Sequence, residues 1–149
     1  MKKQSILVFI LAIYSLFLAN LLLFKINLLK FGRLRFRFTD NGTAGRANFL
    51  PFKTILPYLL GKRGWLIAMI NLGGNIILFV PIGFLVPFVY QKMNWQKALA
   101  LAVAAPLLIE GIQLVFRLGI FDIDDVILNA LGIIVGYSLY RIILKRRSS

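Results

Sequence analysis

Four long apolar runs, separated by short polar segments, organise the chain. The first run, residues 5–24, carries no charged residue, and a helix of that length, at about 1.5 Å rise per residue, crosses the hydrocarbon core of a bilayer. Three more apolar runs follow, at about 65–90, 98–117 and 125–144. The pattern predicts an all-α membrane protein with about four transmembrane helices, and no repeat or linker divides residues 1–149 into separate domains.

The longest polar segment, residues 25–64, lies between the first two runs and is strongly basic. Within it, Arg33, Arg35 and Arg37 alternate with bulky apolar residues. Alternation is typical of a strand, so a short hairpin is one interpretation. We favour the other, in which this basic extramembrane loop lies in the lipid headgroup layer.

Composition narrows the chemistry that the chain can perform. Hydrophobic residues make up 60% of it, and the mean hydropathy is +0.84. It contains neither cysteine nor histidine, which excludes disulfides, thiolate nucleophiles and histidine-dependent hydrolysis. Any reaction could then use only carboxylates, amides, hydroxyls and the side chains of lysine and arginine, with a hard cation such as Mg²⁺ where a metal is needed. We expect no cofactor and no dedicated metal site.

The net charge of +13 points to lipids rather than to nucleic acid. Basic clusters beside transmembrane helices orient those helices and bind anionic headgroups. A nucleic-acid partner would need a soluble basic domain, and the sequence predicts none. Membrane lipids are therefore the expected partners.

Charge alone does not fix the orientation in the membrane. With four spans, both termini share a side with the 91–97 loop, and that side carries eight Lys and Arg residues against ten on the other. This count is too even for the positive-inside rule to decide the orientation. We weigh the short loop and the basic tail more heavily, and so expect both termini to be cytoplasmic. The first run exceeds the usual signal-peptide core and lacks a cleavage site, so we expect an uncleaved anchor.

Acidic residues cluster where a membrane protein tolerates them least. Four of the five acids fall between Glu110 and Asp125, and ionisable groups at membrane depth are usually paired or functional. At about 100° per residue, Glu110, Gln113 and Arg117 lie within about 60° of one another on one helix. That face would carry an acid, an amide and a base. Asp122 or Asp124 could instead cap the fourth helix.

Polar and small residues also share faces on the second and fourth spans. Asn71 and Asn75 are one helical turn apart, so they face other helices rather than lipid. On the fourth span, one stripe holds Asp125, Asn129 and a Gly132-xxx-Gly136 pair. Such a glycine pair admits a closely packed neighbour.

Several motifs follow one another in an order that resembles the VanZ-like family. They are Asn48-Phe49-Leu50-Pro51-Phe52, Asn71-xxx-Asn75-xx-Leu78-Phe79-Val80-Pro81, Glu110-xx-Gln113-xxx-Arg117 and Phe121-Asp122-xx-Asp125-xxx-Asn129-xx-Gly132-xxx-Gly136-Tyr137. The resemblance covers most of the chain after Arg46. It implies a small multi-pass protein of the bacterial cytoplasmic membrane. The family is named for a member that confers low-level teicoplanin resistance, and the resemblance implies no defined reaction.

We predict that these polar residues converge at one membrane face to bind a ligand. Arg117 is the residue expected to contact an anion, because a planar guanidinium suits phosphate or carboxylate. The alternative is a buried polar network in which Glu110 pairs with Arg117 and the asparagines bond across helices. The candidate residues are Arg46, Asn48, Asn71, Asn75, Glu110, Gln113, Arg117, Asp122, Asp125 and Asn129.

Three functions follow from this site. The first is a protein that binds or masks an anionic cell-envelope component, such as a lipid-linked wall precursor, and modulates glycopeptide susceptibility. The second is a membrane enzyme that acts on lipid-linked intermediates through carboxylates and Mg²⁺. The third is a structural helper of a larger complex or a homo-oligomer, with Gly132-xxx-Gly136 as the dimer face. We favour the binding protein over the enzyme, because the aspartate spacing at 122–125 fits no familiar catalytic pattern.

Overall fold

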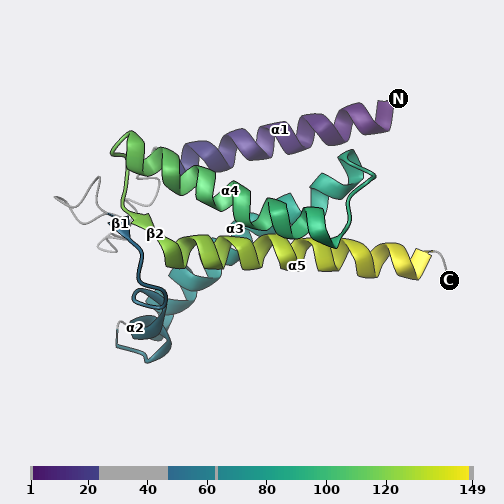
Figure 1. Ribbon diagram of the computed structural model, residues 1–149. Coiled ribbons are helices and arrows are strands. Elements are labelled where there is room, and N and C mark those ends of the chain that lie inside the picture. The colour runs from purple at the N-terminus through teal and green to yellow at the C-terminus, as the bar shows by residue number, and fades with distance from the viewer. Residues whose placement is uncertain (1, 24–46, 63, 148–149) are drawn as a thin grey trace.

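A computed structural model describes residues 2–23, 47–62 and 64–147 (Figure 1). The predicted headgroup segment around Arg33 to Arg37 lies outside these residues. The elements in chain order are α1 (Lys2–Leu23), β1 (Ala47–Asn48), α2 (Ile55–Leu59), α3 (Trp65–Val89), α4 (Trp95–Val115), β2 (Phe121–Asp122) and α5 (Ile123–Arg147).

Four helices among the described residues are long and apolar enough to cross a membrane, which confirms the predicted fold class. The candidate spans are Gln4–Leu22, Trp65–Val89, Trp95–Val115 and Ile123–Leu144. The third begins earlier than predicted because Asn94 caps α4, its Oδ1 accepting a hydrogen bond of 2.9 Å from the Lys97 backbone N–H. It also ends at Val115 rather than at 117.

Both termini lie at one end of the bundle, together with the turn between α3 and α4 (Figure 1). The opposite end carries α2, the paired strands β1 and β2 and the turn between α4 and α5 (Figure 1). We call this opposite end the polar end, because the candidate carboxylates gather there. The described connections between the spans therefore lie at two opposite ends of the bundle.

The closest helix contact joins α3 to α5 through glycine. A Cβ added to Gly132 would overlap the Ile76 carbonyl oxygen, and one added to Gly136 would overlap the Val80 carbonyl oxygen. The glycines therefore let two backbones approach more closely than any side chain would allow. The predicted close neighbour of this pair exists, and it is α3 of the same chain. The assignment of Gly132-xxx-Gly136 as a dimer face was wrong, since both residues are buried within one molecule.

The core of the bundle lies where all four spans meet. Leu18 of α1, Phe79 of α3, Ala102 of α4 and Ile133 of α5 form one buried cluster, each at most 2% exposed. Elsewhere α1 turns large apolar side chains outward, as hydrocarbon surroundings allow. Since lipid tails are as apolar as these side chains, close packing and hydrogen bonds hold the helices together.

Candidate functional site

Asp124 ties the loop between β1 and α2 to the start of α5. Its side chain is fully buried, and its two oxygens accept hydrogen bonds from the backbone N–H groups of Phe52, Thr54 and Ile55, at 2.5, 2.6 and 3.0 Å. Hydrogen bonds to an ionised carboxylate are stronger than neutral ones. These contacts satisfy the carboxylate within the protein and fix the loop over the end of the bundle.

Asp122 performs the capping role that the sequence allows, and it adds two loop contacts. Its Oδ1 accepts hydrogen bonds of 3.0 Å from the Asp124 backbone N–H and from Asn48 Nδ2. The Thr54 hydroxyl donates to Oδ2 at 2.7 Å. Parallel pairing of β1 with β2 sets Asn48 opposite Asp122. The loop and the first turn of α5 therefore form one hydrogen-bonded unit.

Two further carboxylates among the described residues, those of Glu110 and Asp125, join α4 and α3 to this network. Glu110 is only 3% exposed, and its Oε2 accepts a hydrogen bond of 3.1 Å from the Asp122 backbone N–H. Asn75 on α3 donates to Asp125 Oδ1 at 2.7 Å. Side chains from α3, α4, α5 and the loop therefore meet at the polar end, as the sequence predicts for Asn48, Asn75, Glu110, Asp122 and Asp125.

Two other candidates make hydrogen bonds elsewhere, and a third has a buried side-chain oxygen without a partner among the described residues. Gln113 is buried, and its Nε2 donates to the Leu22 carbonyl oxygen at 2.8 Å, which joins α4 to α1. Asn71 donates to the Ile67 carbonyl oxygen of its own helix, at 2.8 Å. Asn129 is 2% exposed, and its Oδ1 accepts no hydrogen bond from the described residues. Arg46 lies outside the described residues.

Arg117 does not share the helical face of Glu110, because α4 has already ended. The Arg117 N–H donates to the Leu114 carbonyl oxygen at 3.2 Å, and the Leu118 N–H donates to the Gln113 carbonyl oxygen at 2.8 Å. This pair of bonds is the Schellman motif that closes a helix, with Arg117 in the left-handed position that glycine usually occupies. Its φ is 55°. The side chain is consequently exposed at the polar end.

Asp124 and Thr54 are central residues that the sequence pattern did not single out. The only signal was local, because Asp124 stands in the first turn of a helix and could equally be a cap or a ligand. Its partners are backbone N–H groups about seventy residues earlier. Because every residue except proline carries such a group, the sequence does not show which of them will donate. A second sign of the tight loop is Phe52, whose φ of 65° is unusual for a bulky residue.

The exposed charged side chains described at the polar end are basic. Asp122 and Asp124 are occupied by donors from the protein, and Glu110 is buried. Lys53, Lys62 and Arg117 are exposed. Within the described part of the chain, no group of three or more acidic residues is placed to hold a metal ion. Among the described residues of the polar end, the charged side chains that are exposed are therefore basic.

Comparison with known proteins gives two matches. The family model described as VanZ/LLP1 matches residues 6–144. Protein VanZ of Enterococcus faecium is 35% identical over 66 residues, which are 44% of this chain and 41% of that protein. The matched stretch is thus less than half of that relative's length. No solved structure matches the chain significantly.

Proposed function

The chain belongs to the VanZ/LLP1 family, and from this premise we propose that it binds an anionic cell-envelope component at the polar end and lowers susceptibility to teicoplanin-type glycopeptides. The proposed ligand is a phosphate or carboxylate carried by a lipid or a wall precursor. The binding residues are the exposed cations of that end, with Arg117 as the principal contact.

One observation carries the proposal, namely the division of charge at the polar end. The aspartates at the start of α5 are held by internal hydrogen bonds, whereas Arg117 is exposed. An arginine offers a planar pair of donors that matches phosphate or carboxylate geometry. The buried network therefore serves as the scaffold that positions the α4–α5 turn, and the turn presents the cation.

The proposal also needs the polar end to face the outside of the cell, the side from which a large polar antibiotic arrives. The chain has no cysteine, so single cysteines introduced at Lys53 and at Lys92 can be labelled without background. A membrane-impermeant maleimide added to intact cells should label K53C at the polar end and leave K92C unlabelled. Labelling of K92C alone would place the polar end in the cytoplasm and contradict the proposal.

A susceptibility assay tests the role of Arg117 directly. We expect expression of the wild type in a sensitive host to raise the inhibitory concentration of teicoplanin, and Arg117→Gln to remove most of that increase. Lys92→Gln is the matched control, because Lys92 is an exposed base on the opposite loop. Membrane levels of each variant are measured in parallel.

Three outcomes of this assay would overturn the proposal. A wild-type protein that reaches the membrane and leaves teicoplanin susceptibility unchanged removes the phenotype. An Arg117→Gln variant that protects as well as the wild type, at equal membrane level, removes the proposed contact. A loss of protection in Lys92→Gln as well would show a general charge effect rather than a site.

A further inference from the structure

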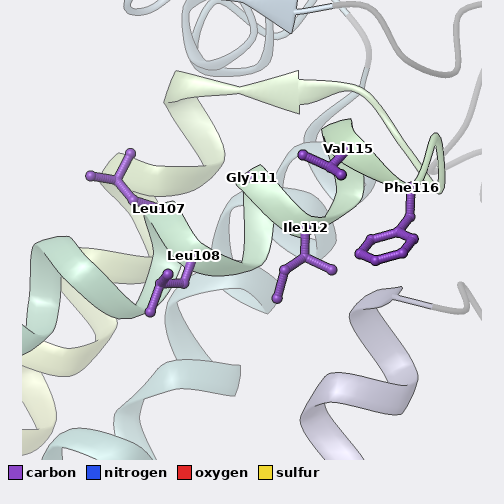
Figure 2. Close-up of a pocket in the computed structure, with 6 residues that line it drawn as sticks. All are labelled: Leu107, Leu108, Gly111, Ile112, Val115 and Phe116. Carbon is purple, nitrogen blue, oxygen red and sulfur yellow. The ribbon is translucent and has the colours of Figure 1, made fainter.

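Apolar side chains that are exposed along a span need no partner other than the surrounding hydrocarbon. Figure 2 shows such side chains on α4, among them Leu108 and Ile112. Helix α2 is different, because it has only five residues, Ile55–Leu59, and is not one of the candidate spans. It lies at the polar end and packs against α3 (Figure 1). An exposed apolar face on this short helix therefore needs an explanation of its own.

The two sides of α2 have opposite environments. Ile55 and Tyr58 are buried against the protein. Leu56, Leu59 and Leu60 are each more than half exposed, and at about 100° per residue they lie within about 100° of one another. We call these three residues the leucine face. The loop before α2 exposes further large apolar side chains, namely Phe49, Leu50 and Phe52. Exposed apolar surface of this kind is unfavourable in water and is typical of an interaction site.

Trp65 indicates the depth at which α2 ends. It is the first residue of the span α3, and its side chain is exposed. Tryptophan at the end of a span is typical of the headgroup level. A Cβ added to Gly61, two residues after α2, would lie 3.6 Å from the Trp65 indole. We therefore expect the end of α2 at the level where headgroups meet hydrocarbon.

Two exposed lysines flank the leucine face, Lys53 before α2 and Lys62 after it. At a membrane surface, lysine extends its ammonium group to the headgroups while its methylene groups lie along apolar surface. The apolar face of an interfacial helix enters the boundary between headgroups and acyl chains to a depth of about 5–10 Å. An anionic bilayer supplies both hydrocarbon and phosphate, whereas a second copy of the chain would bring the same positive charges.

Hydrogen bonds to the start of α5 fix the orientation of this segment. Asp124 accepts from the N–H groups of Phe52, Thr54 and Ile55, so the loop and the first residue of α2 are tied to a span. Phe52 has a φ of 65°, which bulky residues rarely adopt, and its side chain is nevertheless exposed. Strained conformations persist where surrounding contacts impose them, often at functional sites. Because the ring gains little burial within the protein, contact with lipid gives its outward position a role.

We propose that α2 is an interfacial helix, with the leucine face in the outer hydrocarbon of the bilayer and with Lys53 and Lys62 among anionic headgroups. The partner is the lipid surface rather than a single bound molecule. Through Asp124, this contact fixes the depth of the polar end relative to the membrane. The inference goes beyond the proposed function, since it requires neither an anion at Arg117 nor an effect on teicoplanin.

Depth measurements on spin-labelled single-cysteine variants test the proposal. The chain has no cysteine, so L56C and L59C each carry one nitroxide, and both positions are exposed. The full-length protein is placed in vesicles of phosphatidylcholine and phosphatidylglycerol. Electron paramagnetic resonance then measures the accessibility of each label to oxygen and to a water-soluble nickel chelate. L16C on α1 is the hydrocarbon reference and K92C is the aqueous one.

The ratio of oxygen to nickel accessibility gives the depth of each label. We expect this ratio for L56C and L59C to exceed that of K92C about tenfold and to approach that of L16C, because oxygen concentrates in the hydrocarbon that the leucine face enters. A ratio equal to that of K92C would place the leucine face in water and overturn the proposal. Low accessibility to both reagents would mean that protein covers the face, as in a dimer, and would also overturn it.

A charge variant tests the contact of the lysines with headgroups. Adding phosphatidylglycerol to vesicles of phosphatidylcholine should raise the ratio for L59C about twofold, and Lys53→Gln with Lys62→Gln should abolish that rise. Lys92→Gln with Arg141→Gln is the matched control, since it removes two exposed bases at the opposite end, and it should leave the rise intact. A rise that persists without Lys53 and Lys62, or that is lost in the control as well, would contradict the assignment of these lysines.

Discussion

Helices α1 and α5 both meet the length and hydropathy of a membrane span, yet the structure uses them in opposite ways. In the spanning part of α1, 6% of the residues are buried, whereas in α5 the share is 39%. The mean hydropathy of the span is 2.4 in α1 and 1.8 in α5, so the more apolar helix is the less buried one. The difference arises from small and polar residues, since α5 carries two glycines against α3 and the aspartates of the polar end.

A substitution in the contact between α5 and α3 should have the largest effect on stability. Gly136→Ala places a Cβ against the Val80 carbonyl oxygen and the Phe84 backbone nitrogen, and neither can rotate away as a side chain would. Overpacking of this kind costs about 1–3 kcal/mol or more. Thermal unfolding in detergent should show a clear loss. Gly111→Ala, which meets no neighbour, should be neutral or slightly stabilising. Equal unfolding temperatures for the two variants would contradict the assignment of the α3–α5 contact.

The anchor at the start of α5 predicts an effect of similar or slightly smaller size. Asp124→Ala leaves the N–H groups of Phe52, Thr54 and Ile55 without their acceptor. Unsatisfied buried polar groups cost about 1–3 kcal/mol each, and water entering the loop would recover part of that cost. We expect a net loss of about 2–3 kcal/mol.

Hydrogen exchange locates this effect. The three amides should exchange much faster in Asp124→Ala, while those of the α3–α5 contact stay protected. Asp122→Ala is the comparison variant, since it removes the acceptor of the Asn48 and Thr54 side chains and of the Asp124 N–H but leaves the Asp124 carboxylate in place. Unchanged protection of the three amides in Asp124→Ala would show that the loop is held by other contacts.

The attachment of α1 predicts a smaller effect. Tyr14 donates a hydrogen bond of 2.6 Å to the Leu78 carbonyl oxygen. Hydrogen bonds between transmembrane helices contribute about 0.6–2 kcal/mol, so Tyr14→Phe should destabilise α1 packing by about 1 kcal/mol. Ser15→Ala, at an exposed neighbouring position, is the control. A loss as large as that of Gly136→Ala would mean that α1 is as integral to the core as α5.

Local patterns predicted the spans and much of the polar network. Apolar runs indicated the four helices, the one-turn spacing placed Asn75 towards the bundle interior, and the Gly132-xxx-Gly136 spacing predicted a close contact. What the spacing could not predict was the partner of that contact. A glycine stripe is equally suited to a helix of the same chain or of another, and only the tertiary arrangement decides between them.

The predictions that depended on extrapolating helix geometry were less accurate. The shared face of Glu110 and Arg117 assumed that α4 continues through residue 117, and the Schellman turn ends it earlier. No glycine marks that end, so the usual signal was missing. The contact of Asp124 with the loop was equally hidden, because its donors are backbone groups far away in the sequence.

A substitution in the turn that joins α4 to α5 should give the smallest change in stability, and it also tests the proposed function. A left-handed conformation costs a non-glycine residue roughly 1 kcal/mol, and Arg117 adopts it with φ at 55°. Arg117→Gly should therefore stabilise the protein slightly, by up to about 1 kcal/mol in thermal unfolding, while removing the exposed cation. If teicoplanin protection falls in this more stable variant, the guanidinium itself is required. If protection persists, the arginine has no part in it.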